Sequence, residues 1–192
     1  MDRIAITGLE KRESILVAKA LSIMSGYDLI LSLPYSQIAF KYGLTSSIEA
    51  CQWPDSYVYC LGAFTERVIM EQGYAERFVS EGSVFKELIW LQYRFPHVDL
   101  IYEQSMIHCM ERVFAEYAAK NYDVIFHSET NESGAGLSRL FATYRIPYQQ
   151  IDFSDRKTAL QAMADYLKIK PKMPAHYSLS KTSRELGEDI SE

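Results

Sequence analysis

The sequence has little of what several protein classes require. Its three cysteines, Cys51, Cys60 and Cys109, are odd in number and no two have CxxC spacing, so neither a disulfide framework nor a zinc ribbon is expected. His97 and His108 lack a third ligand at helical spacing, and we predict no metal site there. No apolar run reaches the roughly 20 residues of a membrane span, and the N-terminal residues do not have the pattern of a signal peptide. We therefore expect a soluble, cytoplasmic protein with reduced thiols and no membrane partner.

Positive charge is also scarce. The 20 Lys and Arg residues against 25 Asp and Glu residues give a formal net charge of −5. Nucleic-acid-binding modules normally carry a basic surplus, so nucleic acid is not an expected partner, and any anion must be bound by a local arrangement of side chains. The length of 192 residues fits one domain.

What the sequence does contain is an alternation of short apolar runs with segments of helical periodicity. We predict strands at residues 3–7, 27–33, 77–80, 122–127 and 147–152. We predict helices at residues 15–24, 36–42, 55–73, 83–93, 99–120, 137–144 and 156–167. Such alternation indicates an α/β fold with about five mainly parallel strands and helices on both faces. We expect residues 1–169 to form this domain and residues 170–192, which are rich in Pro, Lys and Ser, to be a flexible tail.

The first predicted strand ends at Thr7-Gly8 and leads into a helix, as in a phosphate-binding loop. That loop also needs a second glycine, a lysine and a Ser or Thr at fixed spacing. Counted from Gly8, these positions hold Glu13, Ser14 and Ile15. The substitutions introduce backbone strain, add a carboxylate that repels phosphate and remove the lysine and a magnesium ligand. Normal binding of ATP is therefore not expected.

Two interpretations of this junction remain open. In the first, it binds no triphosphate: Thr7 and Glu10 form a capping box, and Glu10 and Glu13 lie at the positive end of the helix. In the second, Lys11 and Arg12 bind an anion from positions that the usual motif does not use. The second interpretation makes Gly8, Lys11, Arg12 and Ser14 candidate cofactor-binding residues.

Two further segments resemble proteins that have a phosphate-binding loop, as the first junction does. Residues 77–88 resemble the segment on the Walker B side of small bacterial P-loop ATPases related to nucleoside and nucleotide kinases, including ribosylnicotinamide-kinase-like domains. Residues 137–148 resemble the closing segment of those proteins, in which the chain returns to the sheet. The chain is thus similar to the P-loop NTPase superfamily over residues 3–167, with a degenerate Walker A loop, and this implies a three-layer P-loop-NTPase-like fold.

The resemblance also implies roles for individual residues. Gly8 matches the first glycine of the loop, and Glu81 matches the acidic catalytic residue that orients magnesium or activates an acceptor hydroxyl. Arg139 and Arg145 fall where the family carries basic residues of the lid or of the base-binding side. The alternatives are that Glu81 simply suits the first turn after a strand and that Arg139 and Arg145 are solvated charges on a helix.

Two other features have an open interpretation. Five tyrosines lie near the second strand or the helix after it: Tyr35, Tyr42, Tyr57, Tyr59 and Tyr74. Aromatic rings in this region could stack on a ligand or pack in a subunit interface. The acidic segment 128–136 could be a lid, a segment that touches a metal, or a surface turn.

The sequence therefore favours a degenerate nucleotide-kinase-like protein without normal ATP hydrolysis or phosphotransfer, which acts by binding a metabolite or a protein. One alternative is an active nucleoside-type kinase, in which Lys11, Arg12 and Arg139 replace the missing lysine and ATP and magnesium are cofactors. The other is a regulatory or structural homo-oligomer whose tail after residue 169 docks a partner.

Overall fold

A five-stranded parallel sheet forms the centre of the protein. The computed structural model describes residues 3–44, 47, 52–73, 76–95, 101–129 and 132–169. The strands are β1 (Arg3–Thr7), β2 (Asp28–Ile30), β3 (Phe78–Glu81), β4 (Val124–His127) and β5 (Tyr148–Gln150). They lie in the order β2-β3-β1-β4-β5, and every neighbouring pair is parallel.

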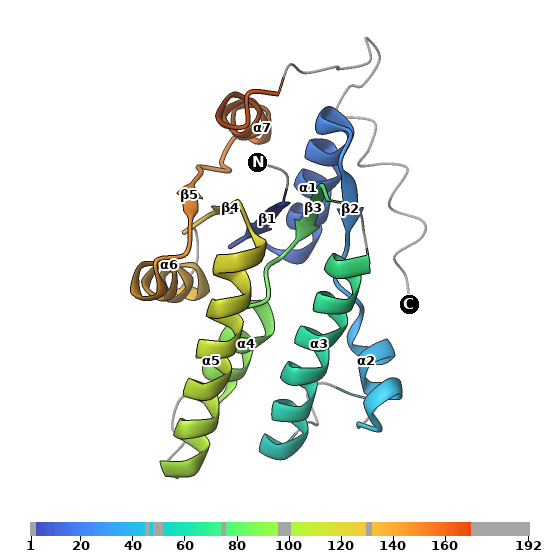
Figure 1. The fold of residues 1–192 in the computed structure, drawn as a ribbon, viewed down its shortest axis with the longest axis vertical. Helices are drawn as coiled ribbons and strands as arrows, with labels where there is room; N and C mark the ends of the chain where they lie inside the picture. Colours follow the sequence, from blue (N-terminus) through green and yellow to red (C-terminus); the bar gives the residue numbers. More distant parts are fainter. Residues whose placement is uncertain are drawn as a thin grey trace.

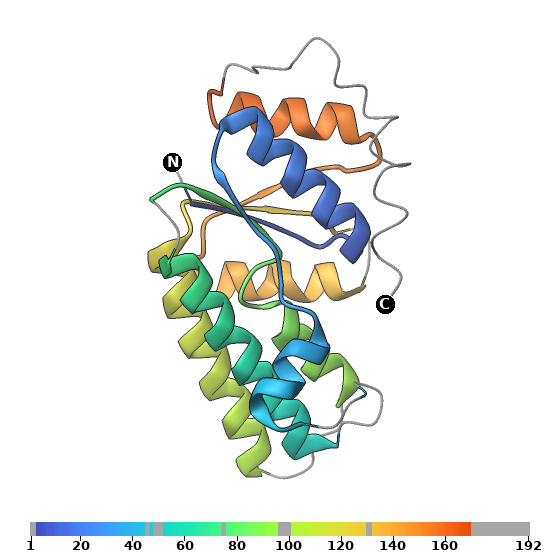
Figure 2. The same cartoon turned by 90° about the vertical axis from the view of Figure 1, so that its right-hand side faces the viewer.

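Helices cover both faces of this sheet (Figures 1 and 2). In the described part of the chain they are α1 (Lys11–Ser25), α2 (Tyr35–Tyr42), α3 (Trp53–Gly73), α4 (Lys86–Arg94), α5 (Ile101–Asn121), α6 (Glu132–Tyr144) and α7 (Arg156–Tyr166). Helices α1 and α7 pack on one face, and α3 to α6 pack on the other. Figure 2 shows α3 and α5 extending past the sheet, with α2 beside α3. The predicted α/β class with five parallel strands is confirmed, and the three layers are consistent with a P-loop-like fold.

The central strand explains why both faces need helices. In β1, Ile4, Ala5 and Ile6 are all fully buried. Because successive side chains of a strand point to opposite faces, Ile4 and Ile6 pack in the cluster with α1 and α7, whereas Ala5 packs in the cluster with α3 to α6. A strand with neither face toward solvent therefore has a continuous run of apolar residues in its sequence.

The ends of several elements differ from the prediction. Helix α1 begins at Lys11, and its N-cap residue is Glu10, whose side chain makes no capping hydrogen bond, so the predicted capping box of Thr7 and Glu10 is wrong. Gly26 ends α1 with a left-handed φ of 74°. Helix α6 begins at Glu132, so the segment predicted as an acidic loop over 128–136 is helical from that residue onward.

Some predictions fall on residues outside the described ranges. These are the tail 170–192, Tyr74, Cys51 and His97. Of the other two cysteines, Cys60 is buried and Cys109 is exposed, and both are free thiols. Among the described residues, no helix has the length and hydropathy that crossing a membrane requires.

Candidate functional site

The carboxyl end of β1 lies at a topological switch point. The connection after β1 runs to the face covered by α1, whereas the connections after its neighbours β3 and β4 run to the opposite face. Ligands of open α/β sheets bind in the crevice at such a point. A cavity of about 80 Å³ opens there. It is lined by residues of the β1–α1 junction, the β3–α4 turn, α4 and α6, namely Thr7, Gly8, Leu9, Ser14, Glu81, Gly82, Lys86, Ile89 and Leu137.

The β1–α1 junction is too closely packed to arch around a phosphate chain. Gly8 has a φ of 84°, and a Cβ atom on it would lie 2.0 Å from the carbonyl oxygen of Ser128. The Ser128 N–H donates a hydrogen bond of 3.1 Å to the Thr7 carbonyl. Only residues 8–10 separate β1 from α1. The junction therefore lies directly against the end of β4, and Gly8 is needed there for close packing.

The first turn of α1 brings one side chain to the cavity. Ser14 is 3% exposed and lines the cavity, and none of the described residues makes a hydrogen bond to its hydroxyl. Glu13 points elsewhere, to the guanidinium of Arg156 at the start of α7, with Oε1 and Oε2 at 2.9 and 2.7 Å. Lys11 and Arg12 are exposed and do not line the cavity. Ser14, a candidate from the sequence, thus lines the same cavity as Glu81.

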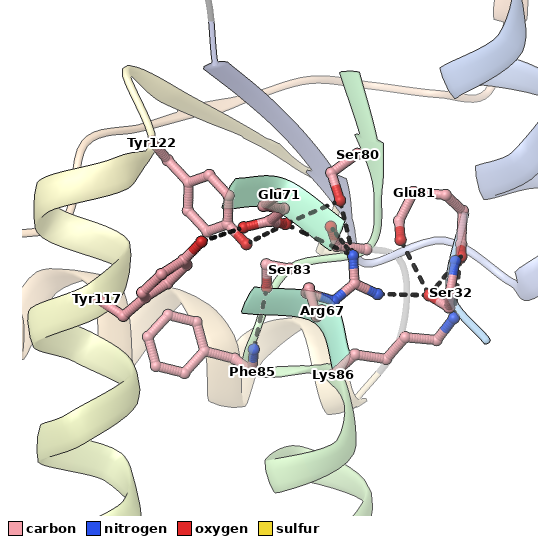
Figure 3. Close-up of polar contacts among 11 residues, drawn as sticks. Ser32, Arg67, Glu71, Ser80, Glu81, Ser83, Phe85, Lys86, Tyr117 and Tyr122 are labelled. Atoms are coloured by element: carbon pink, nitrogen blue, oxygen red, sulfur yellow. Dashed lines mark hydrogen bonds and ion pairs between the residues drawn. The ribbon is translucent and has the colours of Figure 1, made fainter. Parts of the chain in front are cut away.

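Glu81, the last residue of β3, is a buried and fully bonded carboxylate (Figure 3). It is 1% exposed. Its Oε1 lies 2.8 Å from Lys86 Nζ, and its Oε2 accepts hydrogen bonds from the hydroxyl (2.6 Å) and the N–H (3.3 Å) of Ser32, which follows β2. Burial alone would raise the pKa of Glu81, but Lys86, Ser32 and the nearby Arg67 outweigh it and hold the pKa at about 2. The carboxylate is therefore ionised at all physiological pH values.

Arg67 ties the end of the sheet to α3 (Figure 3). The residue is 2% exposed, and its guanidinium donates to Ser80 Oγ at 2.6 Å, to the carbonyl of Gly82 at 3.4 Å and to Ser32 Oγ. Burial lowers the pKa of Arg67, but the surrounding carboxylates raise it above its ordinary value. A charged fork in this position fixes the carboxyl ends of β2 and β3 relative to α3.

Glu71 is the second buried carboxylate of the same group (Figure 3). It lies 3.8 Å from Arg67 and accepts hydrogen bonds from Tyr117 (2.9 Å), Tyr122 (2.9 Å) and Ser80 (3.1 Å). Burial raises its pKa, although Arg67 and the two tyrosines partly oppose this. Because every oxygen has a partner, Glu71 links α3 to α5 and β3 and has a structural role.

The structure brings together only part of the predicted site. Gly8, Ser14 and Glu81 meet at the cavity. Arg139 and Arg145 are exposed and do not line it, which agrees with the alternative that they are solvated charges. Lys11 and Arg12 are likewise outside it.

The sequence reasoning missed Lys86, Arg67 and Ser32. Lys86 carried a signal, because it lies five residues after Glu81 at the start of a predicted helix and so within reach of that carboxylate. Arg67 and Glu71 have the i, i+4 spacing of a helical ion pair. The only sequence signal for Ser32 was its position near the end of the second predicted strand.

Of the five tyrosines singled out in the sequence, the four that the structure describes lie in three environments. The rings of Tyr35 and Tyr59 lie 5.0 Å apart, and Tyr59 contacts Trp90 of α4 edge-on at 5.5 Å. Tyr42 donates to Glu66 at 2.9 Å, and Tyr57 packs against the core between α3 and α5. Tyr35, Tyr59 and Trp90 thus form one aromatic group between α2, α3 and α4.

The cavity does not fit a magnesium-bound nucleoside triphosphate. It is far smaller than the roughly 300–1,000 Å³ of sites that hold whole ligands. Its one cation, Lys86, is already paired with Glu81. The position of the loop lysine holds Ser14, and the glutamate in place of the second glycine is bonded to Arg156. Among the described residues, no group of three or more His, Cys, Asp or Glu side chains is arranged so that it could hold a metal ion.

No protein-family model matches the chain, and no curated protein is significantly similar to it.

Proposed function

We propose that this protein is a kinase-like binding protein that does not transfer phosphoryl groups. The observation that carries the proposal is the charge at the switch point. No basic residue of α1 reaches the cavity, and Lys86 is neutralised by Glu81 at 2.8 Å. A triphosphate needs a local surplus of positive charge and backbone N–H groups that turn toward it, and neither feature is available at Gly8.

The ligand of such a protein is a metabolite that carries little negative charge. The ion pair at the cavity is Lys86 with Glu81, and the buried Arg67 lies 3.8 Å from Glu71. Each cation thus has a carboxylate beside it, and no positive charge is left in surplus for a phosphate group. Each phosphate oxygen placed near the ionised Glu81 would be repelled by about 4 kcal/mol per charge pair at 4 Å and an effective dielectric constant of 20.

Calorimetric titration with ATP and GTP, with and without magnesium and up to millimolar nucleotide, tests the proposal. We expect no saturable heat and no rise in melting temperature. A ligand at about 100 times its Kd would stabilise the fold by about 2.7 kcal/mol, so the thermal measurement is sensitive. Saturable binding or magnesium-dependent turnover that is lost in Glu81→Ala would overturn the proposal in favour of an active kinase.

A gain-of-function variant makes a negative result informative. Replacing Arg12 and Glu13 by Ser-Gly-Lys makes the junction read Gly-Leu-Glu-Lys-Ser-Gly-Lys-Ser, the complete phosphate-loop pattern. If the loop alone has been lost, this variant gains binding of magnesium-ATP, whereas the same replacement with methionine in place of the new lysine does not. Absence of any gain in the folded variant would contradict the assignment of this junction as a degenerate phosphate loop.

The regulatory homo-oligomer remains a second hypothesis from the sequence, and no contact among the described residues favours it over a monomer. Sedimentation of the full chain at several concentrations separates the two, because only the oligomer shows a concentration-dependent mass.

A further inference from the structure

The cavity at the carboxyl end of β1 has room for a small molecule. Its volume of about 80 Å³ corresponds to about five to eight water-sized groups, since one water needs roughly 10–15 Å³ of such space. A compound of three or four carbon atoms with its substituents matches this number of groups, whereas a hexose or a nucleoside exceeds it. The side chain of Lys86, at the cavity, is 34% accessible, so the cavity can be reached from solvent.

The side chains around this cavity are of two kinds. Four of them can form hydrogen bonds, namely those of Thr7, Ser14, Glu81 and Lys86. Three others are aliphatic, namely those of Leu9, Ile89 and Leu137. A matching ligand therefore carries several polar groups on a short carbon skeleton.

The two hydroxyls of the cavity can both bond to a ligand. Ser14 is 3% exposed and Thr7 is 5% exposed, and no hydrogen bond within the described part of the chain uses either side-chain oxygen. Each hydroxyl can donate one hydrogen bond and accept others. Because polar groups removed from bulk water are nearly always hydrogen-bonded, these two hydroxyls favour a ligand with polar groups of its own.

The ion pair of Lys86 and Glu81 can also bind a ligand without being broken (Figure 3). Lys86 Nζ uses one of the three donors of an ammonium group to bond Glu81 Oε1 at 2.8 Å. Oε1 accepts no second hydrogen bond from the described residues, whereas Oε2 already accepts two from Ser32. The ammonium only donates and the ionised carboxylate only accepts, so a ligand that bonds both must accept and donate, as a hydroxyl does. Because the pair is neutral as a whole, it favours an uncharged ligand.

We propose that the four polar side chains of this cavity bind an uncharged polyol of three or four carbon atoms. One hydroxyl of the polyol accepts from Lys86 and donates to Glu81, and its neighbours bond the hydroxyls of Ser14 and Thr7. A carboxamide also donates and accepts, but a single amide group cannot serve four side chains. A carboxylate cannot donate to Glu81 and would add negative charge beside it. This inference rests on the proposed function, since it requires a ligand of little charge in this cavity, and it names the class of that ligand.

Titration of the ¹⁵N-labelled full chain with erythritol and glycerol, followed through its backbone amide signals, tests the inference. We expect saturable shifts of the signals of Gly8 and Gly82, which line the cavity, and none for Gly26 at the other end of α1. 1,4-Butanediol has the carbon chain and terminal hydroxyls of erythritol but no adjacent hydroxyls. Sucrose controls for the general effect of polyols on the solvent and is too large to enter. If neither polyol gives saturable shifts, or if either control matches erythritol, the inference is wrong.

Three variants locate the site. Ser14→Ala should bind erythritol about fivefold more weakly, as for the loss of one hydrogen bond, and should melt at the temperature of the wild type. Ser22→Ala makes the same change on α1, removes a hydroxyl that bonds the Tyr27 carbonyl at 2.6 Å, and should retain binding. Thr7→Val keeps the shape of the side chain and should also weaken binding about fivefold, which keeps the test open if Ser14→Ala does not fold.

Failure of this inference and failure of the proposed function give different results. Unchanged binding of erythritol in both Ser14→Ala and Thr7→Val, or an equal loss in Ser22→Ala, overturns the polyol site whatever the nucleotide titration shows. Tighter binding of acetamide than of erythritol would assign the cavity to an amide and would overturn it as well. Saturable binding of magnesium-ATP instead overturns the proposed function, even where erythritol binds.

Discussion

We expect the free energy of unfolding of this protein to fall at acidic pH because of Glu81. Its pKa is held at about 2 against an ordinary value of 4.5, and each pH unit of such a difference corresponds to about 1.4 kcal/mol. The carboxylate therefore contributes about 3 kcal/mol to the free energy of unfolding at neutral pH. Because the folded pKa is lowered, this contribution is complete above pH 4.5 and is lost as the pH falls from about 4.5 to about 2.

Substitution Glu81→Gln isolates this contribution. The variant keeps the shape of the side chain but has no charge for Lys86 at 2.8 Å. Lys86 is itself partly exposed, with 34% of its side chain accessible, so water can solvate the ammonium that is left. We expect the variant to be less stable than the wild type by about 3 kcal/mol at pH 7 and nearly equal to it at pH 2.

Urea unfolding followed by circular dichroism at intervals between pH 2 and pH 7 measures the difference. Other carboxylates also titrate in this range. Glu71, whose pKa burial raises, works in the opposite direction and favours the folded state as the pH falls. These groups are the same in both proteins and cancel in the difference. A difference in stability that stays constant across the range would refute the assignment of a low pKa to Glu81.

Three further changes probe other parts of the structure. Arg67→Met should lower the free energy of unfolding by about 3–5 kcal/mol, because it leaves buried carboxylates unpaired; a loss under 1 kcal/mol in urea unfolding would show that the network is dispensable. Gly8→Ala should destabilise by more than the roughly 1–2 kcal/mol of a left-handed residue, since its Cβ would lie 2.0 Å from a carbonyl oxygen; a melting temperature equal to the wild type would contradict the close packing of this junction. In a Cys51→Ser background, Ellman's reagent should modify Cys109 rapidly and Cys60 only after denaturation. The reason is that burial raises the pKa of the Cys60 thiol well above its usual range. Rapid modification of two thiols in the folded protein would contradict the burial of Cys60.

The sheet was predictable from the sequence because its strands are buried on both faces. Residues 4–6 and 124–126 are continuous apolar runs with no polar alternation, which is typical of parallel strands under two layers of helices. The five predicted strands all occur, although β2 and β5 are three residues long and shorter than expected. Strand ends depend on pairing with neighbours, and one chain segment does not carry that information.

Helix starts were less predictable than helix ends. Gly26 ends α1 because a left-handed residue favours glycine, and this signal is local. The start of α1 has no comparable signal, since Glu10 caps it without a side-chain hydrogen bond. The start of α6 at Glu132 was hidden by the polar composition of residues 128–136, which indicates a loop when read alone.

The candidate site was predictable only where its residues are close in sequence. Gly8, Ser14 and Glu81 were identified from their places after β1 and β3. The contacts that define their chemistry span long distances in the chain: Glu13 bonds Arg156, 143 residues away, and Ser32 bonds Glu81, 49 residues away. Since these partners are chosen by the strand order, the direction of Glu13 away from the cavity could not be deduced from the junction itself.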